Sequence, residues 1–123
     1  MTNSIFKSDR TFVVFSYSAS HGLLLLRSPK ANPTPTRVDV LIQDVRAIEI
    51  RSWFDGIEIL EVQSDYLREF RSNPIEMLGS GNRVYALRGN GWQGFIAGGI
   101  VSTHEDEGEF SAPSKLMGNE LKW

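Results

Sequence analysis

Two apolar stretches near the start of the chain flank a short polar segment. Residues 11–17 are rich in β-branched and aromatic side chains, and residues 23–28 begin with four consecutive leucines. The first composition favours a strand. Small hydroxyl residues and a glycine at positions 18–22 suit a tight turn between the two stretches. The pattern therefore predicts a β-hairpin, although four leucines alone also fit a helix.

The next two segments predict a loop and then a meander of strands. Residues 28–36 contain three prolines, which fix φ and remove amide donors, so we expect an exposed loop there. From residue 37 to residue 63, apolar residues alternate with polar ones, and the alternation changes register near Asp44. Asp55 and Gly56 lie between two alternating runs, a strong signal for a two-residue hairpin turn with positive φ at the glycine.

The second half of the chain predicts two helical turns and a further hairpin. Asp65 can cap a short segment at residues 66–71, and residues 73–76 combine a capping asparagine, a proline and a glutamate. Residues 83–88 and 92–103 then predict two strands joined through a Gly-Asn-Gly turn. The residues after 103 give mixed signals, so a last strand, an ordered wrap and a frayed tail stay open.

Taken together, these segments predict a mainly β protein of the β-rich α+β type. We expect a compact antiparallel barrel or sandwich of about seven strands with a short helical insertion. Residues 1–123 are expected to form a single globular domain, in which residues 1–10 and 113–123 are loosely ordered. The chain has 123 residues, of which 41% are hydrophobic, enough for one core.

Charge and cysteine content change the range of expected functions. The formal net charge is −2, which offers no long-range attraction for nucleic acid or an anionic membrane. The chain has no cysteine, so disulfides, thiolate metal sites and a cysteine nucleophile are excluded. The first residues lack the pattern of a signal peptide, and no apolar run is long enough to span a bilayer. We therefore expect a cytoplasmic protein.

One motif matches the glycine pattern of dinucleotide-binding proteins. Residues 89–94 read Gly-Asn-Gly-Trp-Gln-Gly. This pattern holds a pyrophosphate only where it opens a helix in a βαβ unit. The residues that follow are β-branched, aromatic and glycine, which favours a strand, so we interpret the motif as a hairpin connection without a nucleotide.

Two other groups of residues have the composition of catalytic or metal sites. Residues 16–21 place three serines beside His21, as a serine hydrolase would require, but strand and turn residues diverge and no nucleophile elbow is present. We expect their hydroxyl and imidazole groups to bond to the local backbone. Residues 104–109 carry a histidine and four acidic residues, without the spacing of a calcium loop. We expect a solvated acidic connection there and no metal.

Arginines and aromatic residues recur through the middle of the chain. Together they could bind a nucleic acid or an anionic ligand. Carboxylates are interleaved with these arginines throughout, which favours cross-strand ion pairs instead. We therefore expect no nucleic-acid partner and no cofactor.

The segment around Trp53 carries the most informative candidate residues. If the strand persists there, Trp53 and Phe54 point to opposite faces, so one aromatic ring should be half exposed. A tryptophan at such a place covers one end of the fold or anchors a partner. The candidate binding or interface residues are Tyr17, His21, Arg51, Trp53, Phe54 and Trp92.

The first half of the chain resembles a group of small uncharacterised bacterial proteins. The resemblance rests on residues 15–28, on the Val-Asp-Val-Leu-Ile run at 38–42 and on the Trp-Phe-Asp-Gly-Ile run at 53–57. It implies a bacterial source. It implies no activity, because none is known for that group.

Two classes of function stay open. The first is a small non-enzymatic protein-interaction or accessory module, favoured because no catalytic set survives the arguments above. Its expected partners are a second copy of the chain, in a homodimer formed through unpaired strand edges, and an unidentified protein. The alternative is a small-molecule-binding protein or modest enzyme that uses a concave sheet face. A deep pocket that collects His21, Tyr17 and arginines would favour this alternative.

Overall fold

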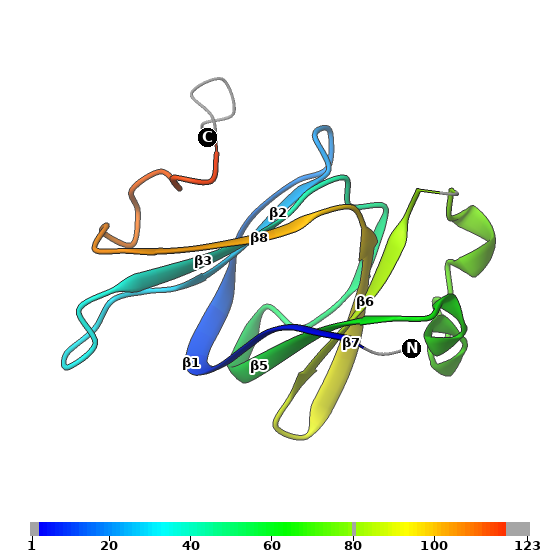
Figure 1. Cartoon of the computed structure of the whole chain (residues 1–123), viewed down its shortest axis with the longest axis horizontal. Coiled ribbons are helices and arrows are strands. Elements are labelled where there is room, and N and C mark those ends of the chain that lie inside the picture. The colour runs from blue at the N-terminus through cyan, green and yellow to red at the C-terminus, as the bar shows by residue number, and fades with distance from the viewer. Residues whose placement is uncertain (1–2, 80, 118–123) are drawn as a thin grey trace.

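The computed structural model describes residues 3–79 and 81–117. In these residues, eight strands form one antiparallel sheet, so the protein is mainly β as the sequence predicts (Figure 1). The strand order is β4-β7-β6-β5-β1-β2-β3-β8. The strands are β1 (Asn3–Ser18), β2 (Leu23–Ser28), β3 (Arg37–Ile42), β4 (Ala47–Glu49), β5 (Trp53–Val62), β6 (Arg83–Gly89), β7 (Trp92–Gly98) and β8 (Val101–Asp106). Two 3₁₀ segments, η1 (Ser64–Glu69) and η2 (Ile75–Met77), form the expected helical insertion.

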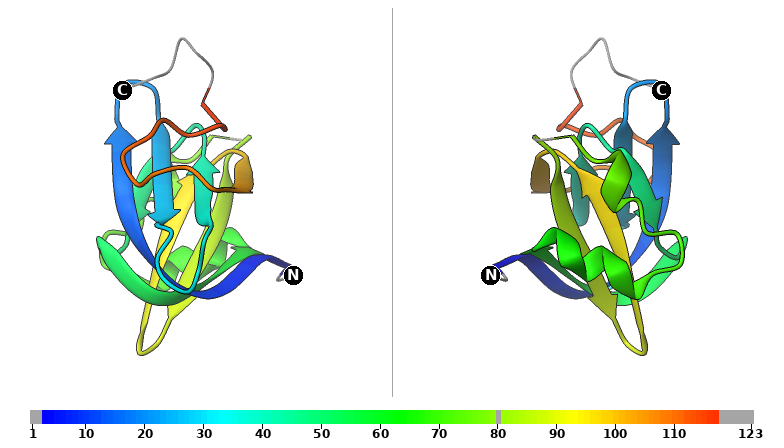
Figure 2. Two further views of the ribbon diagram at one scale, coloured as in Figure 1. Left: turned by 90° about the vertical axis from the view of Figure 1, so that its left-hand side faces the viewer. Right: turned by 90° about the vertical axis from the view of Figure 1, so that its right-hand side faces the viewer.

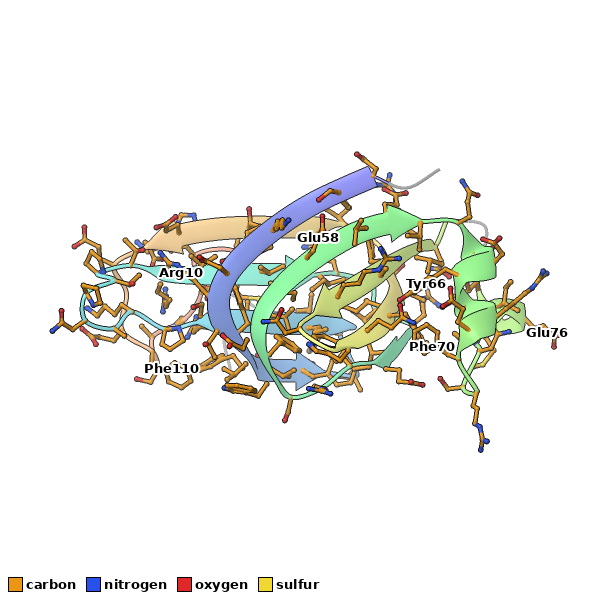
Figure 3. The ribbon with its side chains drawn as sticks, turned by 90° about the horizontal axis from the view of Figure 1, so that it is seen from below. Arg10, Glu58, Tyr66, Phe70, Glu76 and Phe110 are labelled. Carbon is orange, nitrogen blue, oxygen red and sulfur yellow. The ribbon has the colours of Figure 1, made fainter. Side chains whose placement is uncertain are left out.

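The sheet is not closed into a barrel but folds over, so that its two halves face each other. The long strand β1 belongs to both halves, because its first part pairs with β5 and its last part pairs with β2. Figures 1 and 3 show β1 curving from one half into the other. Apolar side chains from the inner faces of both halves form the central core, among them Phe12, Leu24, Leu26, Val40, Ile42, Phe54, Ile59, Tyr85, Leu87 and Ile96.

Backbone hydrogen bonds join the two ends of the sheet at one corner. There β3 leads into β4, and β7 leads into β8. The Gln43 amide donates to the Ile100 carbonyl at 3.0 Å, and the Gly99 amide donates to the Gln43 carbonyl at 2.8 Å. A Cβ atom on Gly99 would lie only 3.1 Å from that carbonyl oxygen. The sequence predicts one strand over residues 92–103, and this close approach is why the chain bends there into two strands.

Both outer faces of the folded sheet are covered. On one half, η1 and η2 pack over β5, β6 and β7, with Tyr66 and Leu67 against Phe95 (Figure 2). On the other half, residues 107–117 cross β2 and β3, and we call this segment the strap (Figure 2). Every residue of β2 and β3 is consequently buried. Cover on both faces explains why the four leucines of β2 do not alternate with polar residues.

The hairpin expected at Asp55 and Gly56 is wrong, because β5 runs through both residues without reversing. The preceding strand β4 pairs with β7 and not with β5. Gly56 does have the expected positive φ, at 83°, but it lies where the register between β1 and β5 shifts. The glycine therefore bends a continuous strand at a bulge. The other two expected hairpins, β1–β2 and β6–β7, are confirmed.

Replacing Gly56 with valine should lower the free energy of unfolding by about 1–2 kcal/mol, because a β-branched residue resists positive φ. Gly56→Asn is the matched variant, since asparagine tolerates this region of φ, and it should lose clearly less. Chemical denaturation of both variants measures the difference. Equal stability of Gly56→Val and the parent would show that the positive φ carries no cost.

Parts of the two termini expected to be loosely ordered, residues 3–10 and 113–117, lie among the described residues, whereas residues 1–2 do not. Residues 3–10 form the first half of β1 and pair with β5. Residues 113–117 belong to the strap, where Ser114 and Met117 are buried. Residues 118–123 of the expected loose terminus lie outside the described residues. Among the helical segments of the described chain, none has the length and apolar character to cross a membrane.

Candidate functional site

One row of side chains crosses the outer face of the half that the strap covers. The row follows directly opposed residues on five neighbouring strands. In order from β5 to β8 it contains Trp53, Val13, Arg27, Asp39 and His104. Opposed residues of an antiparallel pair lie on the same face of the sheet, so these five side chains are neighbours.

Two arginine–aspartate ion pairs lie on this face, one fully buried and the other with its aspartate 16% exposed. Arg27 and Asp39 form a bidentate pair, with Nε–Oδ1 at 2.7 Å and Nη2–Oδ2 at 3.1 Å. Their side chains are 0% and 1% exposed. Arg37 binds Asp106 in the same way, with both hydrogen bonds at 3.0 Å. This forked geometry suits the planar guanidinium group and fixes its orientation.

The remaining guanidinium donors hold the strap by its main chain. Arg27 Nη1 donates to the carbonyl oxygens of Phe110 and Ala112. Arg37 Nη1 donates to the carbonyls of Glu109, at 2.7 Å, and Ala112, at 3.0 Å. Two arginines from neighbouring strands thus converge on one carbonyl group. The aspartates fix the orientation of the two guanidinium groups. The guanidinium groups in turn donate hydrogen bonds to strap carbonyls that have no partner in a strand ladder.

Apolar contacts complete the attachment of the strap. Met117 and Leu116 pack against the outer-face leucines of β2 and β3, which are Leu23, Leu25 and Leu41. Gly108 lies directly over Arg37, where a Cβ atom would come within 2.6 Å of the guanidinium carbon. Any other residue at position 108 would therefore displace the Arg37 guanidinium group from its present position.

Aromatic side chains form an exposed ridge beside the strap. Phe15 and Phe110 make an edge-to-face contact with ring centroids 5.1 Å apart. The Arg27 guanidinium lies 4.0 Å from the Phe15 centroid on the same face. Val13 continues the surface to Trp53. We call Trp53, Val13, Phe15 and Phe110 the aromatic ridge; its two ends, Trp53 and Phe110, are 54% and 45% exposed.

The environment of Asp106 shifts its acidity. Burial alone would raise the pKa of this carboxyl, but the hydrogen bonds from Arg37 and the Gly108 amide, with the charges of Arg37 and His104, lower it below its ordinary value of 3.8. The ionised form is therefore favoured in the folded protein. A lowered pKa contributes stability above the unfolded-state value and loses it as the pH falls through the folded-state value.

Replacing Asp106 with asparagine should consequently destabilise the protein at neutral pH and much less at about pH 2. As the pH falls through the lowered pKa of Asp106, the carboxyl of the parent takes up a proton and loses its charge, so the two proteins become more alike. Urea denaturation at both pH values measures the two differences. A destabilisation that stays the same at both pH values would mean that the charge of Asp106 has no part in it.

The candidate residues around Trp53 fall into two groups. Trp53 and Phe54 point to opposite faces as expected, since Phe54 is 1% exposed and Trp53 is the half-exposed ring. Phe54 stacks on Trp92 across the inner core, with centroids 5.2 Å apart. Arg51 lies 5.6 Å from the Trp92 ring. Arg51, Phe54 and Trp92 therefore form one group, and Trp53 lies on the other face of the sheet.

His21 and Tyr17 lie in neither group. His21 is in the β1–β2 turn, where its Nδ1 lies 3.0 Å from the Ser18 hydroxyl and 3.3 Å from the Ser20 hydroxyl. A hydrolase triad requires a carboxylate on one imidazole nitrogen and the nucleophile on the other. Here both hydroxyls share a single nitrogen, so no triad is formed, and they bond to the imidazole and not to the local backbone that the sequence predicts. Tyr17 is exposed at the end of β1, opposite Leu24.

The glycines of the dinucleotide-like motif have a structural use. Residues 89–94 form the β6–β7 connection and the start of β7, and no helix begins there. A Cβ atom on Gly94 would lie 2.3 Å from the Glu49 carbonyl oxygen, so glycine lets β4 approach β7. Among the residues that the structure describes, no three acidic or histidine side chains come together to hold a metal ion.

A hollow of about 580 Å³ lies between η2 and the neighbouring ends of β5 and β6. Its lining includes Val62, Ile75 and Val84, together with Glu61 and Arg83, whose charged groups are 3.9 Å apart. A smaller hollow of about 320 Å³ lies beside Trp92. Neither of these two hollows is lined by His21 or Tyr17.

Local sequence patterns predict neither the two arginine–aspartate pairs nor the strap that they hold. One signal was present: Asp39 lies between Val38 and Val40 in an apolar strand, and Arg27 follows four leucines. A charged residue within such a run requires a buried partner. The identity of that partner depends on strand register, which no local pattern supplies.

Comparison with known proteins gives no further information about the site, since no family model, curated protein or solved structure matches this chain.

Proposed function

We propose that this protein is a non-enzymatic protein-interaction module that contacts its partner through the aromatic ridge. The observation that carries the proposal is the exposure of Trp53, 54%, on the face of the sheet that also carries Phe15 and the exposed Phe110. Large aromatic side chains dominate the binding energy of protein interfaces. The resemblance to bacterial proteins and the absence of cysteine support a bacterial cytoplasmic setting.

Arg27, which is held by Asp39, lies beneath Phe15 of the ridge. This rigid base favours the ridge over other exposed apolar residues as the contact surface. Met77 and Ile100 are more exposed than Trp53, at 79% and 59%. They lie in a 3₁₀ segment and in the corner between β7 and β8, away from any aromatic cluster. Phe15, by contrast, rests on a guanidinium fixed by a buried carboxylate. A rigid aromatic surface loses little conformational entropy on binding, which favours affinity.

Quantitative capture from a lysate of the source cells tests the proposal. The immobilised proteins are the parent, Trp53→Ser and Ile100→Ser, the last of which removes an exposed apolar residue outside the ridge. We expect at least one protein to bind the parent and Ile100→Ser equally and to lose about tenfold or more with Trp53→Ser, as for a binding hot spot. Equal recovery on all three proteins would refute a role for the ridge.

Small-molecule binding is a second candidate, and the hollow of about 580 Å³ favours it. This volume lies in the range of ligand sites. Polar side chains, among them Glu61 and Arg83, line the hollow beside Val62, Ile75 and Val84, so a polar or charged small molecule is the expected ligand. Screening a library of small anions and metabolites by thermal shift tests it. A ligand of this hollow should raise the melting temperature of the parent and fail to raise that of Arg83→Ala.

A further inference from the structure

The strap is attached in a way that resembles a bound peptide more than a strand of the sheet. Residues 107–117 form no ladder with any described strand. Their own backbone bonds are short turns, from the Ala112 amide to the Glu109 carbonyl and from the Met117 amide to the Ser114 carbonyl. Leaving the sheet would therefore break none of its ladder hydrogen bonds.

The arginines of the face beneath the strap are held in place by aspartates of β3 and β8, which lie outside the strap. Each aspartate takes Nε and Nη2 of its arginine. This leaves Nη1 of Arg27 and Nη1 of Arg37 to meet main-chain carbonyls, and both reach Ala112 at 3.0 Å. Donors that are fixed in advance bind with little loss of conformational entropy.

The contacts of the strap indicate what kind of peptide this face binds. Carbonyl groups of the strap are recognised by the two arginines, whatever side chains accompany them. Side-chain selectivity comes from two apolar contacts, Phe110 against Phe15 and Met117 against Leu23, Leu25 and Leu41. The ligand is thus a peptide that contains two short turns, with an aromatic residue and, seven positions later, a methionine.

We propose that the strap of one molecule binds the face of a second copy, so that two chains exchange their straps in a homodimer. The inference rests on the proposed function, because it names the partner that the aromatic ridge meets. Exchange reproduces in the dimer the contacts that each strap makes within its own chain. Such swapping requires no new recognition surface, only release of the exchanged segment.

The exposed ridge supplies the contact that favours the dimer over the closed monomer. A segment tethered in its own chain has an effective concentration of about millimolar, so exchange alone yields few dimers below that concentration. Phe110 belongs both to the strap and to the ridge, where it packs on Phe15. In the proposed dimer, the body of the second chain lies beside the exchanged strap and covers Trp53, which is exposed in the monomer. Burial of this side chain is gained only in the dimer.

The absence of cysteine makes strap exchange directly measurable by crosslinking. Lys30 and Glu109 join the strap to its face, with Nζ–Oε1 at 2.7 Å. Both side chains are partly or largely exposed, so replacing them costs little stability. Lys30→Cys and Glu109→Cys are prepared as separate full-length proteins and as a double variant. A short bismaleimide is the crosslinker.

We expect the mixture of the two single variants, at high micromolar concentration, to give a crosslinked heterodimer. The double variant should give an internal crosslink when dilute, which verifies the position of the strap. Ile100→Cys mixed with Glu109→Cys is the control for random collision, because residue 100 lies away from the strap, and it should give at least tenfold less heterodimer. Adding Trp53→Ser to both single variants should lower the yield several-fold.

An internal crosslink in the double variant without heterodimer in the mixture would overturn the exchange, and so would equal yields in the mixture and the collision control. Heterodimer formation that Trp53→Ser leaves unchanged would overturn the role assigned to the ridge in dimerisation. Failure of the proposed function would look different: in the lysate experiment, capture would be insensitive to Trp53→Ser. Capture of a protein other than this chain through Trp53 would support the proposed function but not the exchange of straps.

Discussion

Replacing Arg27 with methionine is expected to lower the free energy of unfolding by about 3–5 kcal/mol, the usual cost of breaking a buried ion pair. The substitution leaves the Asp39 carboxylate, which is 1% exposed, without the charge of Arg27. It also removes a donor to the Phe110 carbonyl and one of the two arginine donors to the Ala112 carbonyl. Guanidinium chloride denaturation measures the loss.

A double variant separates the buried charge from the loss of packing. Arg27→Met combined with Asp39→Leu removes both charges, and replacing a buried pair with apolar residues is often close to neutral. The double variant should therefore be more stable than Arg27→Met alone. If the two variants unfold at the same denaturant concentration, the unpaired carboxylate is not the source of the loss.

Replacing Gly94 with valine is expected to cost about 3 kcal/mol, at the upper end of the range for overpacking. A Cβ atom there would lie 2.3 Å from the Glu49 carbonyl oxygen and 3.2 Å from Ile50 Cγ2, so β4 must move away from β7. Gly81→Val is the matched control, because no atom lies within 4 Å of a Cβ at that position.

Thermal and chemical denaturation of the Gly94 and Gly81 variants measure this effect. Amide exchange should also accelerate in β4, since its pairing with β7 is the contact that the added side chain disrupts. A Gly94→Val protein as stable as Gly81→Val would show that β4 does not approach β7 as closely as described.

Local patterns predict the parts of this fold that local chemistry determines. Turn residues between two strand-forming runs identify the β1–β2 and β6–β7 hairpins. Asp55 and Gly56 carry an equally strong turn signal, yet the chain continues as β5. Here tertiary pairing decides: β1 supplies a long partner for β5, and the positive φ of Gly56 is used for a bulge.

The candidate site was predictable only in part, for a related reason. The exposure of Trp53 follows from strand alternation, which places it opposite the buried Phe54. The pairing of Arg27 with Asp39 depends on the register of β2 with β3. The strap depends on contacts between residues more than 80 positions apart, such as Arg27 with Phe110. Tyr17 and His21 have side chains that are common in binding and catalytic sites. Among the described residues, however, the structure brings no carboxylate or arginine to them that would complete such a site.

The most direct test of the central claim, that the aromatic ridge is the contact surface, is the fluorescence of Trp53 alone. A protein with Trp92→Phe and Trp123→Phe keeps this single indole. This variant is titrated with the protein fraction that the parent captures from the lysate. The emission of that fraction alone is measured separately and subtracted, so that the remaining signal comes from Trp53. The account predicts a shift of the Trp53 emission to shorter wavelength and loss of iodide quenching on binding. An emission spectrum and quenching that stay those of an exposed indole in the bound state would contradict it.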